Sequence, residues 1–166
     1  KFKIKYCEAV STGKEIIIFG VSYALLDLAD AGLNLSKATI IETGGMKGRR
    51  HELTNVELQQ ILREGFGVQQ ILSEYGMTEL LSQAYCIADQ NFSCPPWMQI
   101  RIRDTYDPFQ EVPFGQKGGL NVIDLANQNS CAFVQTDDLG RLTPEGFLIE
   151  GRLEATDVRG CNQLVD

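Results

Sequence analysis

The sequence predicts an α/β protein in which a parallel βαβ sheet is followed by a smaller, mainly antiparallel β subdomain. Two observations predict this fold class. In the first half, short apolar runs rich in β-branched residues alternate with helical segments, which is the chain order of right-handed βαβ units. After Tyr85, strand-like runs follow one another with Gly, Pro and Asn turns between them. We therefore expect an α/β subdomain over residues 1–90 and an antiparallel β subdomain over residues 91–166.

The first half contains three predicted strands and two predicted helices. The strand runs are short, apolar and rich in β-forming residues, which suits buried strands. The second helix begins with a T-x-x-E capping box, Thr54 and Glu57, and ends near Gly65 and Gly67. The predicted strands cover 15–19, 38–42 and 68–75, and the predicted helices cover 22–32 and 54–67.

The second half contains four predicted strands. Gly, Pro and Asn residues separate them, which is typical of an antiparallel meander. The stretch "NFSCPPW" at 91–97 is the expected connector between the two subdomains. The predicted strands cover 98–104, 118–125, 131–137 and 146–151.

The composition excludes several classes of partner. With 15 basic and 22 acidic residues, the net charge of the 166-residue chain is −7. Nucleic acids need clustered Lys and Arg, and the densest basic run, "KGRR" at 47–50, is only four residues long. No apolar stretch is long enough to cross a bilayer, and no signal core opens the chain. We expect a cytoplasmic protein that binds neither nucleic acid nor membrane.

The cysteines do not predict a disulfide framework. Five of them, an odd number, are spread along the chain without a C-x-x-C pair, so reduced thiols in a reducing compartment are expected. With one histidine, His51, a zinc site is not expected either. The cysteines are Cys7, Cys86, Cys94, Cys131 and Cys161.

Three polar segments fall at predicted strand ends, where open α/β sheets bind ligands. They are 43–50, 75–79 and 136–140. Glycines let backbone N–H groups approach a ring or an anion. A hydroxyl and a carboxylate on the first turn of a helix suit a phosphate and its magnesium, and an aspartate at a strand end suits ribose hydroxyls. Taken singly, each segment also has a plain explanation as a turn or a helix cap.

Taken together and in this order, these segments resemble the adenylate-forming superfamily of acyl-CoA synthetases, luciferases and related ligases. The resemblance is carried by "YGMTE" at 75–79, "TDDLGRL" at 136–142 and "GFLIEGRLE" at 146–154. Within the superfamily, "ETGGMKGRR" at 42–50 and "GGLNVIDLAN" at 118–127 are most similar to the LuxE-like acyl-protein synthetases. The phenylacetate-CoA ligases come second. No G-x-G-x-x-G follows a strand, which argues against a Rossmann oxidoreductase.

The resemblance implies catalytic roles for three residues of these motifs. Glu79 matches the glutamate that binds magnesium, and Thr78 matches the hydroxyl that contacts the α-phosphate of ATP. Arg152 matches the arginine that reaches the ribose or a phosphate, and Glu154 stands where the family often has an interdomain hinge.

The resemblance also implies a nucleotide-binding set. Tyr75 and Gly76 match the pair that lies along adenine, with Gly44 and Gly45 on its other side. Asp138 matches the aspartate that holds the ribose hydroxyls.

The sequence departs from the family pattern at several points. Asp137 replaces the glycine of the usual Thr-Gly-Asp, which adds a carboxylate beside the expected ribose site. The upstream phosphate loop and the C-terminal domain with its catalytic lysine have no counterpart here. We therefore expect this chain to be the C-terminal portion of a longer enzyme and not to turn over alone.

Cys161 is the expected acyl acceptor. LuxE-like enzymes pass the acyl group from AMP to one of their own cysteines near the C-terminus, and Cys161 is the cysteine in that region. The neighbouring Arg159 favours the thiolate, which is the nucleophilic form. The alternative is a partly buried structural thiol.

The predicted function is ATP- and Mg²⁺-dependent activation of a carboxylic acid, a fatty acid by the LuxE resemblance, followed by transfer to a thiol. The thiol is Cys161 or, in an acyl-CoA ligase of the phenylacetate type, coenzyme A. The implied partners are the acid, the upstream part of the same protein and an acyl-accepting reductase. A degenerate nucleotide-binding module without catalysis is the alternative from another class.

Overall fold

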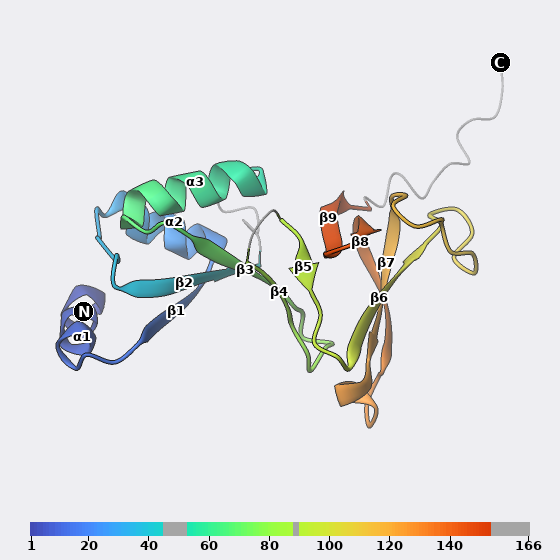
Figure 1. Ribbon diagram of the computed structural model, residues 1–166, viewed down its shortest axis with the longest axis horizontal. Helices are drawn as coiled ribbons and strands as arrows, with labels where there is room; N and C mark the ends of the chain where they lie inside the picture. Colours follow the sequence, from blue (N-terminus) through green and yellow to red (C-terminus); the bar gives the residue numbers. More distant parts are fainter. Residues whose placement is uncertain (45–52, 88–89, 154–166) are drawn as a thin grey trace, which may run out of the picture. The chain divides into compact units, whose positions relative to one another are not determined.

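The computed structural model describes residues 1–44, 53–87 and 90–153 (Figure 1). Internal contacts divide the chain into two compact units, Lys1–Tyr75 and Gly76–Asp166. Each unit is described by itself. The subdomain boundary that we placed after residue 90 stays a prediction.

The first unit is built on a parallel sheet, as predicted. Its strand order is β1-β2-β3, with Ile16 opposite Ala38 and Ile40 opposite Ile71. Because both crossovers run in the same direction along the sheet, their right-handedness puts α2 and α3 on one face. The elements are α1 (Phe2–Ser11), β1 (Ile16–Val21), α2 (Ser22–Asp30), β2 (Ala38–Thr43), α3 (Asn55–Phe66) and β3 (Ile71–Tyr75). Helix α1 was not predicted.

The predicted capping box opens α3. The Thr54 hydroxyl accepts the Glu57 N–H at 3.3 Å, and the Glu57 carboxylate accepts the Thr54 N–H at 2.9 Å. At the other end Gly67 adopts the left-handed conformation with φ of 68°. The predicted bounds of this helix are therefore confirmed within a residue or two.

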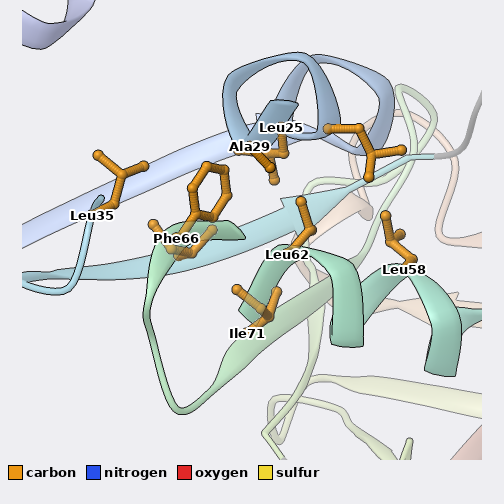
Figure 2. Packing of buried hydrophobic residues seen from close by; sticks show 9 residues of the cluster. Leu25, Ala29, Leu35, Leu58, Leu62, Phe66 and Ile71 are labelled. Carbon is orange, nitrogen blue, oxygen red and sulfur yellow. The ribbon is translucent and has the colours of Figure 1, made fainter. Parts of the chain in front are cut away.

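The core of the first unit lies between its two crossover helices and the sheet (Figure 2). Leu62 and Phe66 of α3 are fully buried, and Leu25 of α2 is 1% exposed. The helices approach closely at Gly65, where an added Cβ would lie 2.7 Å from the Cβ of Ala29. The cluster consists of Leu25, Leu26, Ala29, Leu35, Ile40, Leu58, Leu62, Phe66 and Ile71.

The second unit is antiparallel, also as predicted. Its strand order is β4-β5-β9-β8-β7-β6. Short β4 and β5 pair through Cys86 and Phe92, and Phe92 pairs with Phe147 of β9. The elements are β4 (Ala84–Cys86), β5 (Phe92–Ser93), β6 (Met98–Arg103), β7 (Gly118–Asp124), the 3₁₀ turn η1 (Leu125–Asn127), β8 (Phe133–Thr143) and β9 (Gly146–Arg152).

Two sequence-based assignments in this unit are wrong. The stretch 91–97 is not only a connector, because Phe92 is buried in β5 and its ring lies 5.5 Å from that of Phe147. A two-residue strand is too short to show an alternating pattern. The strand predicted at 131–137 instead begins at Phe133 and continues to Thr143, so "TDDLG" lies inside a strand rather than at its end.

Truncating Phe66 tests the first core. We expect Phe66→Ala to lower the free energy of unfolding by about 3–5 kcal/mol, because it leaves a cavity between α3 and the sheet. The matched control is Phe109→Ala, whose ring is 97% exposed. It should change stability by less than about 0.5 kcal/mol in urea denaturation. Equal losses in both variants would contradict the core described here.

Candidate functional site

The "YGMTE" segment follows the end of β3. Tyr75 is buried, at 8% exposure, whereas Thr78 and Glu79 are exposed in a turn closed by the Leu80 N–H and the Met77 carbonyl at 3.1 Å. We expected these two side chains on the first turn of a helix, and that expectation is wrong. The chain instead passes through bends into the short strand β4. In the part of the chain that the structure describes, the side chains of Thr78 and Glu79 make no hydrogen bond or ion pair.

A buried carboxylate explains why no helix forms here. Oδ2 of Asp124, at the end of β7, accepts the N–H groups of both Leu81 and Ser82 at 2.9 Å. Oδ1 accepts the Ser82 hydroxyl at 2.6 Å and the Ala126 N–H at 3.1 Å. In a helix beginning at Thr78, the N–H groups of Leu81 and Ser82 would point to carbonyls of the helix's own first turn and would be lost to Asp124.

The side chain of Asp124 is ionised despite its burial. Its exposure is 0%, and burial by itself raises the pKa of a carboxyl group. The Ser82 hydroxyl and the N–H groups of Ser82, Leu81 and Ala126 outweigh burial and bring the pKa of Asp124 below its usual value.

Asn127 holds the same segment at a second point. Its Nδ2 donates to the Glu79 carbonyl at 2.7 Å and to the Cys131 carbonyl at 2.9 Å. The residue is 5% exposed. Both amide hydrogens are therefore used, one on the "YGMTE" turn and one on the loop that leads to β8.

The structure brings Asp138 and Arg152 together. They are cross-strand partners on β8 and β9, and Nε of Arg152 lies 4.0 Å from Oδ1 of Asp138. Nη2 of Arg152 also lies 3.8 Å from Oδ2 of Asp137. The side chains of Arg152 and Asp137 are 73% and 69% exposed, whereas that of Asp138 is 23% exposed. All three groups are within reach of a ligand from solvent.

A bulge in β8 places Asp137 and Asp138 beside one guanidinium. The register pairs on either side are Gly119 with Leu139 and Asn121 with Gln135. Between them β7 has one residue, Leu120, whereas β8 has the three residues 136–138. The Thr136 hydroxyl donates to the Leu120 carbonyl at 3.0 Å and accepts the Asp138 N–H at 3.1 Å.

Arg103 supports this bulge from the interior. Its guanidinium donates to the carbonyls of Leu120 (3.0 Å) and Thr136 (2.8 Å) and to Oδ1 of Asn121 (3.0 Å). Arg103 is 4% exposed, and burial lowers its pKa while the charge of Asp137 raises it. The guanidinium fits because position 119 is glycine, where a Cβ would lie 2.5 Å from Cζ of Arg103.

Gly44 lies after β2 and has a left-handed φ of 71°. The Ser22 hydroxyl oxygen lies 2.9 Å from the Gly44 carbonyl and 2.8 Å from Oε2 of Glu42. One hydroxyl hydrogen cannot serve both acceptors. Burial raises the pKa of Glu42, although the hydroxyls of Ser22 and Ser73 lower it. The raised pKa favours the protonated form of Glu42, which can donate to Ser22 and so leave the hydroxyl hydrogen for the Gly44 carbonyl.

The predicted site residues fall into two groups. Gly44 and Tyr75 belong to the first unit, and Gly76, Thr78, Glu79, Asp138 and Arg152 belong to the second. Gly45, Glu154 and Cys161 lie outside the described residues. The sequence reasoning missed Arg103, Asp124 and Asn127, because no local pattern shows that these side chains are buried against the site segments.

Comparison of the sequence with known proteins relates the chain to a distant ligase. No protein-family profile matches the chain. A long-chain-fatty-acid–luciferin-component ligase of Vibrio harveyi is 26% identical over 168 aligned residues, which include 90% of this chain. The chain spans 44% of the length of that relative.

Solved structures share the fold. The ATP-bound MatB of Rhodopseudomonas palustris matches with a TM-score of 0.62 and 17% identity over 84% of this chain and 31% of that one. The O-succinylbenzoate coenzyme A synthetase of Bacillus subtilis, in complex with ATP and a magnesium ion, matches with a TM-score of 0.61 and 21% identity over 90% of this chain and 34% of that one. The fold is therefore part of that of an adenylate-forming ligase.

The chain thus shares the fold of adenylate-forming ligases and is similar in sequence to a ligase of the LuxE type. Within the described ranges, no helix combines the length and apolar composition needed to cross a bilayer. Nor do three or more His, Cys, Asp or Glu side chains gather there as a ready metal cage. A magnesium ion held by Glu79 would take its other ligands from phosphate oxygens and water, which is the usual manner for magnesium.

Replacing Glu42 by Gln removes a pH-dependent loss of stability. The folded protein binds the Glu42 proton more tightly than the unfolded chain, because the pKa of Glu42 is raised above 4.5 on folding. Binding of this proton to Glu42 stabilises the folded protein fully below about pH 4.5. The stabilisation is lost as the pH rises through the folded-state pKa. Glu42→Gln should therefore gain unfolding free energy relative to wild type between about pH 4 and pH 8. Urea denaturation at both pH values measures this gain, with exposed Glu15→Gln as control. A pH-independent difference would contradict a raised pKa of Glu42.

Arg103→Lys tests the support of the bulge. Lysine keeps the charge but cannot reach all three acceptors in the same plane, so we expect a loss of at least about 2 kcal/mol of unfolding free energy. Arg101→Lys, two residues earlier on β6 and paired with Glu111 at the surface, should cost less than about 0.5 kcal/mol. Comparable losses for the two variants would show that Arg103 has no special structural role.

Proposed function

We propose that the protein containing this chain activates a carboxylic acid with ATP and passes the acyl group to a thiol. The observation that carries the proposal is the state of Thr78 and Glu79. Both side chains are exposed and make no hydrogen bond in the described structure, although hydrogen bonds to the buried residues Asp124 and Asn127 fix the backbone from Glu79 onward. The cross-strand pair Asp138 and Arg152 and the adenylate-forming fold support the same reaction.

The reaction requires positioning and charge neutralisation rather than a protein nucleophile. An oxygen of the acid forms a bond to the α-phosphorus of ATP, the bond from that phosphorus to the β-bridging oxygen breaks, and pyrophosphate leaves. In this proposal Thr78 donates to an α-phosphate oxygen, and Glu79 binds the magnesium ion that neutralises the phosphates. Arg152 adds positive charge beside the ribose or phosphate.

The remaining residues of the predicted set bind the nucleoside. We assign the ribose hydroxyls to Asp138, whose carboxylate is less exposed than that of Asp137. We assign the adenine to Tyr75 and Gly76, together with Gly44 and Gly45, as the family resemblance implies. Glycines at 44 and 45 allow the backbone to approach the base closely.

A hollow in the second unit is our candidate for the tail of the acid. It has a volume of about 340 Å³, within the usual range for small-molecule sites, and begins two residues after Glu79. Its walls are mainly apolar, with Leu81 65% and Trp97 52% exposed. The name of the Vibrio harveyi relative specifies a long-chain fatty acid, and we propose the same class here. The lining residues are Leu81, Ser82, Gln83, Tyr85, Ser93, Cys94, Pro95 and Trp97.

The acceptor that we propose is Cys161. Cys94 lines the hollow, but burial raises its pKa to about 11, so little thiolate forms there. Cys86 is buried at 3% exposure. Coenzyme A is the alternative acceptor, and an acyl-accepting reductase in the cytoplasm would take the group onward.

A nucleotide-binding module without catalysis is the second candidate. Asp137 favours it, since its carboxylate lies 3.8 Å from Nη2 of Arg152 and competes with a ligand for that charge. Such a module would bind AMP without releasing pyrophosphate.

Intact-mass analysis of the full natural protein separates these functions. We expect ATP, magnesium and a mixture of carboxylic acids to produce pyrophosphate and an acyl adduct. Cys161→Ser should keep pyrophosphate release and lose the adduct. Glu79→Gln should lower pyrophosphate release roughly 10²-fold, whereas exposed Glu145→Gln should not change it.

The other outcomes are equally specific. Pyrophosphate release in wild type and Cys161→Ser without an adduct on either would assign the acyl group to coenzyme A or another acceptor. Saturable AMP binding without pyrophosphate release would contradict the ligase and favour the module.

A further inference from the structure

We propose that Asp124 and Asn127 are positioning residues that hold the Thr78–Glu79 turn in the geometry needed to bind magnesium. This inference rests on the proposed function. Neither residue touches the reacting groups. Their side chains bind the backbone of residues 79–82 at three points, and the Ser82 hydroxyl donates to Asp124 as well.

The two side chains hold both ends of a short segment. Asn127 fixes the carbonyl of Glu79 itself at 2.7 Å. Asp124 accepts the N–H groups of Leu81 and Ser82, the second and third residues after Glu79. The carbonyl of Glu79 and two N–H groups that follow it are thereby fixed, which restrains the backbone on the C-terminal side of Glu79. The carboxylate is thus aimed by the backbone and stays available for a ligand.

The holding residues are themselves immobilised. Asp124 pairs with Met98 of β6, and its N–H donates to the Ala132 carbonyl at 2.8 Å. The Ser82 hydroxyl, which donates to Asp124, also accepts the indole N–H of Trp97 at 2.9 Å. The bonds therefore form a connected network anchored in the antiparallel sheet, which gives the turn a rigid support.

The chemistry of this arrangement is unusual for a simple connection between strands. A fully buried carboxylate is costly unless every lone pair is engaged, and here four donors engage it. A loop that only joined two strands would need no buried charge. A loop that must hold one carboxylate toward a cation benefits from rigid backbone partners, as metal ligands do in general.

Asn127→Ala in the full natural protein tests the inference. It removes the bond to the Glu79 carbonyl and leaves Thr78, Glu79 and Asp124 in place. We expect the dissociation constant of magnesium from the ATP complex, measured by titration calorimetry, to rise 10- to 100-fold, and the magnesium concentration for half-maximal, acid-dependent pyrophosphate release to rise with it. The rate at saturating magnesium should recover most of its wild-type value. A variant that was merely less well folded would lose rate at every magnesium concentration without this shift.

The matched control is Asn91→Ala in the same unit. Its side chain accepts a bond from the Thr143 hydroxyl at 2.7 Å, so the variant also loses an amide contact, but one away from the turn. Its half-maximal magnesium concentration should stay within twofold of wild type. Asp124→Asn should shift the magnesium curve in the same direction as Asn127→Ala. Because that variant removes a buried charge and can fail to fold, the Asn127 variant decides the question.

The outcomes separate this inference from the proposed function. An active wild type with an unshifted magnesium curve in folded Asn127→Ala would overturn the inference and leave the proposed function standing. An equal shift in Asn91→Ala would also overturn it, because the effect would then be general loosening. A wild type that releases no pyrophosphate with any acid would remove the proposed function and the inference with it.

Discussion

A buried charge must be surrounded by hydrogen-bond partners, and in the second unit this requirement shapes both candidate site segments. Asp124 and Arg103 occupy opposite ends of the β6–β7 pair, at positions opposite Met98 and Gly119. Asp124 gathers the N–H groups that follow the "YGMTE" turn, and Arg103 gathers the carbonyls around the β8 bulge. The two segments that carry exposed side chains, the "YGMTE" turn and the β8 bulge, are thus held by the buried side chains of Asp124 and Arg103.

The first unit is held together mainly by apolar packing. Its two crossover helices cover one face of a parallel sheet, and the close approach at Gly65 lets them share one core (Figure 2). That core positions β2 and β3, whose ends carry Gly44 and Tyr75. Glu42, a buried acid of this unit, lies beside the hydroxyls of Ser22 and Ser73, and burial raises its pKa despite them. Burial thus raises the pKa of Glu42, whereas four donors bring that of Asp124 below its usual value.

Much of the fold could be predicted because its signals are local. The capping box at Thr54, the apolar runs of the parallel strands and the turn residues of the meander each act over a few residues. The motifs of the candidate site could be recognised for the same reason, because each is a short continuous stretch of sequence. The failures have a common physical cause, since the bulge at 136–138, the missing helix after Thr78 and the strand at Phe92 depend on partners far along the chain. Arg103, Asp124 and Asn127 look like ordinary polar residues until the strands pair and bury them.

The most direct test of adenylate formation is the acid-dependent exchange of labelled pyrophosphate into ATP by the full natural protein with magnesium. Exchange reports the reversible first step alone and needs no thiol acceptor. We expect exchange that appears only when a suitable acid is present and that persists in Cys161→Ser. Absence of exchange with every acid, under conditions where the folded protein binds ATP, would contradict carboxylate activation as the function of this fold.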